Sequence, residues 1–300
     1  MQNNENQSRF EPDPSHRIAV VMGTYNRGEL LYRSLLHYAE QGLPHTIIVF
    51  DDGSDDDTFF VCKAMDDERF PNIKLIYNRL EKEPGKWRDS ACYLNAGIAY
   101  ALHVLKSQYI FITHPEIIPG RNLLKTACRK LDTLGYARIN AKGYYLTPGQ
   151  QEKIEEADLD VGIAGIRNLP DFYQESEAGN GNKDYTARAI DNALTWGSWI
   201  WGGFTAYNWR RFGGVFESET WGAVDVEFME RCRRLNVQTV TPLELEAMVI
   251  HQNHDIPGIP VTPRNNDWME TLRGVELRAR PELISKERWE PLNYNPQNLL

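Results

Sequence analysis

The sequence has no apolar run of about 18 residues, the length that a helix needs to cross the hydrocarbon core of a bilayer. Its first residues, MQNNENQSRFEPDPSHR, are polar and lack the basic and then apolar order of a secretory signal. We therefore expect a cytoplasmic protein with no transmembrane segment.

An excess of basic residues is also missing. Thirty-three Lys and Arg stand against 42 Asp and Glu, which gives a formal net charge of -9. Proteins that bind nucleic acid through phosphate contacts need a basic surface to displace counterions. We expect no nucleic-acid partner.

Cysteine is scarce, and its spacing is unlike that of a metal site or a disulfide framework. The four cysteines lie far apart and form no CxxC pair. Three of them fall in segments that we expect to be helical, so we interpret them as buried thiols.

Short apolar runs alternate with helical patterns in the first half of the chain. The runs are followed by polar turn residues, as is typical of strands buried on both faces of a parallel sheet. This alternation predicts an α/β fold with an open, mostly parallel sheet flanked by helices. The predicted strands cover residues 18–22, 46–50, 73–77 and 108–112, and the longest predicted helix covers residues 88–105.

The rest of the chain gives weaker signals. We expect a disordered lead-in over residues 1–16, one domain over residues 17–255 and a surface extension over residues 256–300. The strand and helix alternation is lost after about residue 135. Residues 170–192 are rich in Gly, Asn and acidic side chains, which predicts a mobile loop.

A motif of two carboxylates follows the second predicted strand directly. Asp51 and Asp52 precede Gly53 and Ser54 at the strand's carboxyl end, where ligands bind in open α/β sheets. A carboxylate there can accept hydrogen bonds from ribose hydroxyls or a base N–H. The alternative is a loop that caps the next helix, because Asp and Ser are preferred capping residues.

A second motif, Thr113-His-Pro-Glu116, follows the fourth predicted strand. His114 and Glu116 lie two residues apart in an extended segment and project the same way, so they could hold a divalent ion that bridges a diphosphate. Oxygen ligands suit Mg²⁺, whereas an imidazole makes Mn²⁺ the more natural ion. His251 or His254, which follow a later apolar strand, could complete the site; the alternatives are a solvated strand exit and an ordinary loop.

A third candidate lies at the start of a helix predicted from about residue 223 to residue 235. Asp225 in its first turn could act as a general base for an acceptor hydroxyl. Alternatively, Asp225 and Glu227 only complement the helix dipole. A nearby aromatic group could stack on sugar rings or pack in the core; it comprises Trp196, Trp199, Trp201, Phe204 and Trp221.

These motifs, in this order, resemble the GT-A glycosyltransferases, especially the large inverting family 2, with a second half like the galactosyltransferase carboxyl-terminal region. The signatures are Val21-Met-Gly-Thr-Tyr-Asn-Arg27, the DDGS loop, Asn95-Ala-Gly97, Gly202-Gly-Phe204, Arg210-Arg-Phe-Gly-Gly-Val-Phe-Glu217 and Asp225-Val-Glu227. The sequence departs from the family at the D-x-D metal motif, which is His-Pro-Glu here, and at Leu94 and Val224, where the family has an Arg and an acid.

The resemblance implies a nucleotide-sugar donor, inverting transfer with Asp225 as the base, and Mn²⁺ or Mg²⁺ as cofactor. It divides the domain into a donor half, residues 17–135, and an acceptor half, residues 136–255. The implied nucleotide contacts are Thr24, Asn26, Arg27, Asp51, Asp52, Lys86, Arg88 and Asn95. The implied metal ligands are His114, Glu116, His251 and His254, and the implied acceptor contacts are Trp201, Gly202, Gly203, Trp221 and Glu227.

The resemblance implies a UDP-sugar as the first donor to consider and a carbohydrate or glycoconjugate as the acceptor. Two rival functions remain open at this stage. One is a nucleotide-sugar-binding protein that has lost metal chemistry, and the other is a sugar nucleotidyltransferase. The latter usually has a glycine-rich phosphate loop after the first strand, of which Gly23 to Gly28 is a poor version.

Overall fold

The computed structural model describes the core of the predicted domain. The described residues are 14–65, 70–80, 90–141, 143–146, 151–152, 201–215, 228, 232, 235–242, 244 and 247–254. The loop expected at 170–192 and the extension expected at 256–300 lie outside them.

The first half alternates strands and helices as predicted, and the strands extend one or two residues beyond most of the apolar runs. Its elements are β1 (Ile18–Thr24), α1 (Gly28–Ala39), β2 (His45–Asp51), α2 (Thr58–Met65), β3 (Ile73–Arg79), α3 (Ser90–His103) and β4 (Tyr109–Thr113). The later elements are β5 (Ile117–Pro119), α4 (Leu123–Thr133), β6 (Ala137–Asn140), β7 (Gly143–Tyr145), β8 (Trp201–Thr205), α9 (Ala206–Phe212), β9 (Gln238–Val240) and β10 (Val249–His251). A short 3₁₀ turn, η1 (Pro14–His16), precedes β1.

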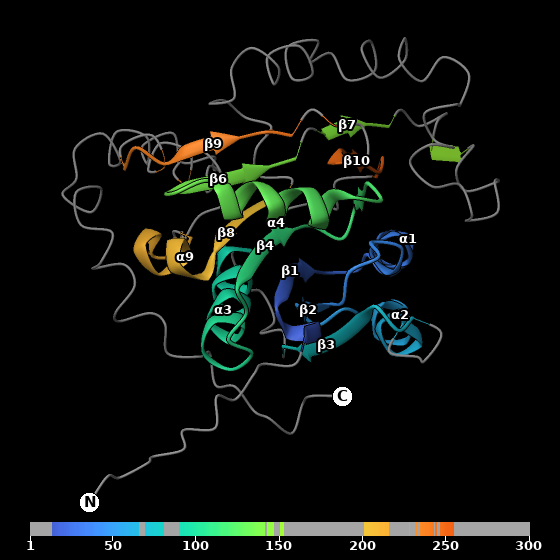
Figure 1. Cartoon of the computed structure of the whole chain (residues 1–300). Coiled ribbons are helices and arrows are strands. Elements are labelled where there is room, and N and C mark those ends of the chain that lie inside the picture. The colour runs from blue at the N-terminus through green and yellow to red at the C-terminus, as the bar shows by residue number, and fades with distance from the viewer. Residues whose placement is uncertain are drawn as a thin grey trace, which may run out of the picture.

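A seven-stranded sheet forms the centre of the molecule, in the order β3-β2-β1-β4-β8-β6-β9 (Figure 1). Strands β3, β2, β1 and β4 are parallel, and β8 runs antiparallel between β4 and β6. Thr24 of β1 pairs with Asp51 of β2, and Met22 pairs with Thr113 of β4. The loops after these three strands therefore leave the sheet at one edge, where α/β folds bind ligands. The predicted α/β fold is confirmed.

Two apolar layers cover the two faces of this sheet. Helices α1, α2 and α4 pack on one face, and α3 and α9 pack on the other. Alternate residues of β1 supply the two layers: Val20 and Met22 face α1, whereas Ala19 and Val21 face α3. Because side chains alternate along a strand, only a strand buried on both faces has a continuous apolar sequence, which explains the runs.

A second, three-stranded sheet in the order β5-β10-β7 lies beside the carboxyl edge of the large one. β10 pairs antiparallel with β5, so that His251 is opposite Ile117, and parallel with β7. This pairing brings the end of β10 next to the turn that joins β4 to β5.

Three of the cysteines, Cys62, Cys128 and Cys232, are buried free thiols, as the sequence predicts. The side chain of Cys92 lies outside the described residues. Among the helices that the structure describes, none combines the length and apolar character needed to span a membrane.

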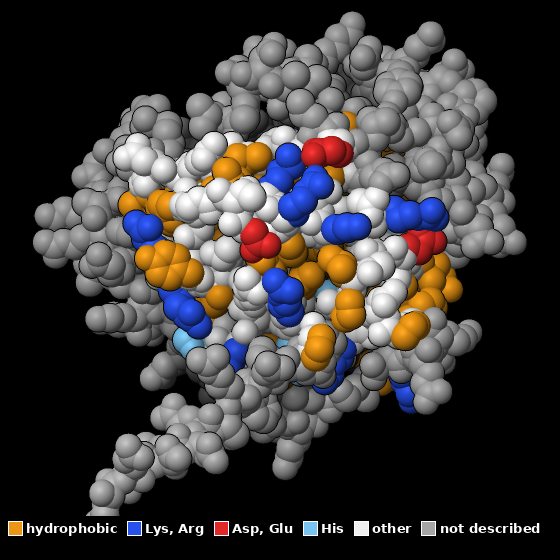
Figure 2. All heavy atoms as spheres, viewed as in Figure 1, with side chains coloured by type: hydrophobic (Ala, Val, Ile, Leu, Met, Phe, Trp, Pro, Cys, Tyr) orange, Lys and Arg blue, Asp and Glu red, His pale blue; other side chains and the backbone are white. Residues whose placement is uncertain are grey.

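The surface over α4 carries both signs of charge, with Lys and Arg in the majority on the face seen in Figure 2. Arg121 pairs with Glu40, and Arg129 and Lys130 pair with Glu244, at N–O distances of 3.3 to 3.7 Å. Ion pairs this exposed contribute at most about 1 kcal/mol each to stability. We interpret this surface as an ordinary solvated helix face.

Candidate functional site

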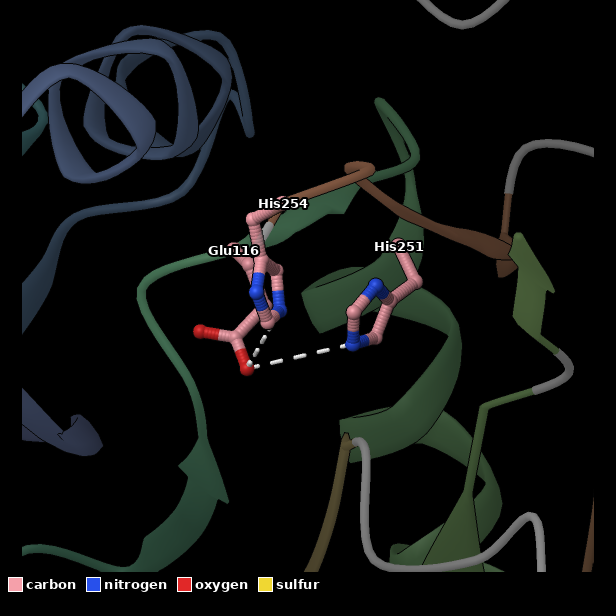
Figure 3. Close-up of side chains that lie close together, drawn as sticks. All are labelled: Glu116, His251 and His254. Carbon is pink, nitrogen blue, oxygen red and sulfur yellow. Dashed lines mark ion pairs between the residues drawn. The ribbon is translucent and has the colours of Figure 1, made fainter. Parts of the chain in front are cut away.

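Three side chains from distant parts of the sequence converge beside the carboxyl edge of the large sheet. Glu116 lies in the turn between β4 and β5, His251 ends β10, and His254 follows three residues later. The carboxylate oxygen Oε1 of Glu116 lies 3.8 Å from Nε2 of His251 and 3.7 Å from Nε2 of His254. One ligand atom from each residue fits within 4.8 Å of the others, a spacing that a single metal ion could bridge (Figure 3).

Gln252, which lies between the two histidines in the sequence, fixes this arrangement. Its backbone N–H donates to the carbonyl of Glu116 at 2.9 Å, and its side-chain amide donates to the carbonyl of Leu30 in α1 at 3.0 Å. Arg33 of α1 donates to the Gln252 side-chain oxygen at 3.4 Å. Gln252 is fully buried, so these bonds join β10, the turn at Glu116 and α1 in a dry environment.

His251 has the protonation state that a metal ligand requires. Its Nδ1 lies 2.8 Å from the carbonyl of Gln252, and because a carbonyl only accepts, Nδ1 carries the proton and Nε2 keeps a lone pair toward Glu116. Burial lowers the pKa of His251 to about 4, although Glu116 and the Gln252 carbonyl act against this shift. The imidazole is thus neutral near pH 7, with its second nitrogen held by the backbone as is usual for metal-binding histidines.

Glu116 is held as a carboxylate. Burial alone would raise its pKa, but the charges of His114, His251 and Arg27 outweigh burial and hold the pKa below the ordinary value. Near pH 7 His251 is neutral, whereas Arg27 keeps its positive charge and still favours the ionised form of Glu116. An ionised carboxylate and imidazole nitrogens form a ligand set that suits first-row transition ions better than Mg²⁺.

The structure brings together three of the four predicted metal residues. Glu116 and the histidines His251 and His254 meet as expected, although no single motif contains them. His114 is not one of the three residues whose ligand atoms converge, and its role as a ligand stays a prediction. His114 lies in the same turn, where its carbonyl accepts from the N–H of Ile117 at 3.1 Å, and its charge acts on Glu116 from there.

Of the two acids in the DDGS loop, Asp51 is structural. It is fully buried, and its carboxylate accepts from the backbone N–H of Ser54 at 2.8 Å, from the Ser54 hydroxyl at 2.5 Å and from the Tyr77 hydroxyl. These bonds engage the Asp51 carboxylate inside the protein, and its contact with a nucleotide stays a prediction. As the last residue of β2, Asp51 points to the same face as Ile47 and Val49, into the apolar layer under α1.

Asp52 and Asn26 lie in two turns that hydrogen bonds join to each other. The backbone N–H of Asp52 donates to the Thr24 carbonyl at 2.9 Å, and the side chain of Asp52 is half-buried. Asn26 adopts a positive φ of 50°, donates from its N–H to the Ser54 hydroxyl at 2.8 Å and accepts at its side-chain oxygen from the N–H of Asp55 at 2.9 Å. These bonds join the turn after β1 to the turn after β2.

Arg27 is half-buried directly before α1, and the Thr24 side chain is buried at the end of β1. The Thr24 hydroxyl makes no hydrogen bond within the part of the chain that the structure describes. Nucleotide contacts by Thr24, Asn26, Arg27 and Asp52 remain predictions.

Asn95 has a packing role. Its side-chain amide donates to the carbonyl of Val215 at 2.7 Å, and its side-chain oxygen accepts from the N–H of Val215 at the same distance. Both ends of the amide are therefore engaged in tying α3 to the segment after α9. The contact of Asn95 with a nucleotide stays a prediction.

The predicted acceptor contacts in β8 are core residues. Trp201 is fully buried, stacks on Phe111 with ring centroids 4.7 Å apart, and donates from its indole N–H to the Tyr38 hydroxyl at 3.0 Å. Gly202 and Gly203 let β8 fit between β4 and β6: a Cβ on Gly203 would meet the carbonyl oxygen of Ile110 at 2.1 Å. The contacts of Trp201, Gly202 and Gly203 described here are packing contacts within the sheet, and their roles as acceptor contacts stay predictions.

Several predicted site residues lie outside the described residues, so their roles in the site stay predictions. They are Lys86, Arg88, Trp221, Asp225 and Glu227, together with the aromatic residues Trp196 and Trp199. The predicted helix that contains Asp225 is described at Phe228 and Cys232, which are both helical.

Sequence reasoning missed Gln252, Tyr77 and Arg79. Gln252 lies between His251 and His254 in the sequence, and this position was the only sign in the sequence that it belongs to the site. Tyr77 and Arg79 end β3, the neighbour of β2; Tyr77 binds Asp51, and Arg79 donates to the carbonyl of Ser54 at 2.6 Å. The sequence did contain a sign that β3 supports the DDGS loop, because two polar residues stand at the end of this otherwise apolar strand.

Comparison with known proteins agrees with the geometry. The model of glycosyl transferase family 2 matches residues 19–92, from β1 to the start of α3. The match covers these residues only, and they are similar to family 2 glycosyltransferases. No curated protein matches the sequence.

Solved structures of glycosyltransferases are similar to this chain at low sequence identity, and the match to TarS supports the fold. S. aureus TarS in complex with UDP-GlcNAc is 15% identical with a TM-score of 0.57, over 90% of this chain and 67% of that chain. The mannosyltransferase PcManGT from Pyrobaculum calidifontis, in complex with GDP-Man and Mn²⁺, is 18% identical with a TM-score of 0.49, over 88% of this chain and 63% of that chain. The chain thus spans about two thirds of the length of these proteins. A galactosyltransferase-like second half is not among these findings.

Proposed function

We propose that this chain transfers a sugar from a nucleoside diphosphate to an acceptor hydroxyl, with the help of a divalent ion held by Glu116, His251 and His254. The convergence of these three side chains at the ligand-binding edge of the sheet, beside the family 2 region, is the observation that carries the proposal. A divalent ion in this position would neutralise the departing diphosphate.

The altered metal motif supports metal chemistry rather than its loss. The family's D-x-D carboxylates are replaced here by one carboxylate and two histidines from a different segment. The three donors are half-buried, and one ligand atom from each lies within 4.8 Å of the others. We propose Mn²⁺ as the ion, because imidazole nitrogen is a poor ligand for Mg²⁺.

Donor recognition belongs to the two joined turns at the ends of β1 and β2. The bonds of Asn26 with Ser54 and Asp55 hold these turns rigidly, so that Asp52 is presented at their surface. A carboxylate in this position can accept hydrogen bonds from a nucleoside. We propose a UDP-sugar as donor, and UDP-GlcNAc, the ligand of TarS, is the first compound to assay.

The proposal for how the acceptor is activated rests on the sequence alone. We propose that Asp225 accepts the proton of the acceptor hydroxyl, which then attacks the anomeric carbon in line with the departing diphosphate and inverts its configuration. Trp221 and Glu227 remain the proposed acceptor contacts.

A thermal-shift panel tests the proposal. A ligand that binds only the folded state raises the melting temperature by mass action, so UDP with Mn²⁺ should raise it more than UDP with Mg²⁺ or UDP alone. Glu116→Gln, which removes the one anionic ligand, should abolish the Mn²⁺-dependent part. Glu40→Gln on the solvated surface is the matched control and should respond as the wild type does.

Product analysis separates the rival functions. A transferase releases nucleoside diphosphate from the donor in the presence of Mn²⁺, and it hydrolyses the donor slowly without acceptor. A pure binding protein turns over no donor, and a nucleotidyltransferase forms an NDP-sugar from a sugar phosphate and a nucleoside triphosphate. Either of the last two results would replace the proposed function.

A further inference from the structure

Two successive peptide groups follow the Cα of His251, and hydrogen bonds hold each of them at both ends. In the first, the His251 carbonyl accepts from the N–H of Leu146 at 3.0 Å. The Gln252 N–H of the same peptide group donates to the Glu116 carbonyl at 2.9 Å. The His251 backbone is therefore fixed between the segment after β7 and the turn that joins β4 to β5.

The second peptide group joins Gln252 to Asn253 and connects two side chains. Its carbonyl accepts from Nδ1 of His251 at 2.8 Å. Its N–H donates to the side-chain oxygen Oε1 of Gln151 at 3.1 Å. A chain of two hydrogen bonds thus runs from Gln151 through this peptide group to the His251 ring, whose Nε2 faces Glu116 (Figure 3).

Gln151 can act on His251 through this chain without touching it. The Gln151 side chain is buried, and in dry surroundings successive hydrogen bonds polarise one another. A peptide group whose N–H is bonded therefore has a carbonyl that accepts more strongly. Because the peptide group is planar, the bond that fixes the direction of its N–H also fixes the direction of its carbonyl oxygen.

The bond at Nδ1 decides which nitrogen of the His251 ring can bind a metal ion. A neutral imidazole carries one proton, and the hydrogen bond made by one nitrogen sets which nitrogen is left to coordinate. With the proton on Nδ1, the lone pair of Nε2 is available on the side of Glu116. If the carbonyl turned away, Nδ1 would lose its acceptor, and the proton would be free to occupy Nε2 instead.

We propose that Gln151 is a positioning residue for the metal site: through the peptide group before Asn253, it holds the proton of His251 on Nδ1. The consequence for metal binding rests on the proposed function of the same site. The position of the proton, however, is a property of the protein without metal, so it can be measured separately.

The test is ¹⁵N NMR of the His251 ring in the metal-free protein at neutral pH, where the two tautomers give different nitrogen shifts. The signals are assigned by their absence in His251→Gln. We expect the wild type to carry the proton on Nδ1. Gln151→Met removes the acceptor but keeps an unbranched side chain of similar length, and it should show a mixture of both tautomers.

Calorimetric titration with Mn²⁺ measures the consequence for metal binding. We expect Gln151→Met to bind Mn²⁺ about 3- to 10-fold more weakly than the wild type. The loss should be smaller than the roughly 10- to 100-fold loss that is usual when a direct partner of a metal ligand is removed, because Gln151 acts one bond further out.

Two variants serve as controls. Gln151→Glu keeps an acceptor oxygen at the same place and should restore the Nδ1–H tautomer. Glu152→Gln changes the exposed neighbour of Gln151, and both the tautomer and the Mn²⁺ affinity should stay those of the wild type. A measurement that needs no variant is amide hydrogen exchange in the wild type, where the Asn253 N–H should be protected from exchange as the Gln252 N–H is.

Two results would overturn the inference. One is a Gln151→Met protein that keeps the proton wholly on Nδ1, even if it is less stable, because Gln151 would then have only a structural role. The other is an unprotected Asn253 N–H in the wild type. A wild type that binds no Mn²⁺, together with a shifted tautomer in Gln151→Met, would instead contradict the proposed metal-assisted function and leave the inference about His251 standing.

Discussion

The backbone N–H of Gln252 donates to the carbonyl of Glu116 at 2.9 Å and thereby joins two segments far apart in the sequence. His251 and His254 lie on either side of Gln252, so this one bond sets where both imidazoles stand relative to the carboxylate. The buried Gln252 side chain makes the connection rigid through its bond to Leu30.

We predict that Gln252→Ala weakens both the fold and the metal site. The change removes the hydrogen bonds of the buried Gln252 amide to Leu30 and Arg33, which should lower the free energy of unfolding by about 1–3 kcal/mol in urea denaturation. Mn²⁺ affinity should fall as well, because the loop with the two histidines loses its support. Gln108→Ala is the control, since the exposed Gln108 lies far from the site along β4. Unchanged stability and affinity in Gln252→Ala would contradict the positioning role.

The two neighbouring acids of the DDGS loop should respond in opposite ways. Asp51→Asn replaces a buried acceptor of three hydrogen bonds and should lower the free energy of unfolding by about 1–3 kcal/mol. Asp52→Asn should cost less stability but weaken UDP binding. Urea denaturation and UDP titration of both variants make the comparison. A larger loss of stability in Asp52→Asn would reverse our assignment of their roles.

Asp225→Asn should leave donor binding almost intact while it lowers turnover by a factor of about 10² to 10⁴, the usual contribution of a general base. Asn is nearly isosteric but cannot take a proton at neutral pH. Glu227→Gln is the matched control and should cost less, because residues two apart on a helix point in different directions. Steady-state kinetics measures the turnover of each variant, and UDP titration measures its donor affinity. Near-normal turnover of Asp225→Asn would contradict the proposal that Asp225 is the base.

His45 should make the fold sensitive to acid. It is fully buried, its Nδ1 donates to the Leu43 carbonyl at 2.7 Å, and burial lowers its pKa to about 4 from an ordinary value of 6.5. The unfolded chain therefore binds more protons than the native one between these values, so stability is lost as pH falls from 6.5 to 4.

The variant His45→Asn, which can keep the bond to Leu43, isolates this effect. Urea denaturation at pH 7 and pH 4.5 should show that the wild type loses more stability than the variant, by roughly 2–3 kcal/mol. His103→Asn on the exposed end of α3 should behave as the wild type does. Equal losses in wild type and His45→Asn would mean that His45 is already charged in the fold.

Much of the fold follows from local sequence, as β1 and β2 illustrate. Their apolar runs predict strands buried on both faces, and turn residues such as Asn26 and Gly53 follow them. The sequence did not predict β8 as a strand, because its Trp and Gly residues resemble a ligand-binding segment. Its glycines are needed only because β4 and β6 approach so closely, which is a property of the assembled sheet.

The sequence by itself determined the α/β fold, the edge at which ligands bind and the residue types available there, because strand period and turn chemistry are local properties. Only the tertiary structure decided which of those residues share a site. Asp51 and Asp52 are adjacent in sequence, yet the last position of β2 turns one into the core and leaves the other half-buried. Glu116 meets His251 and His254 because β10 pairs with β5, a long-range contact that no local pattern encodes.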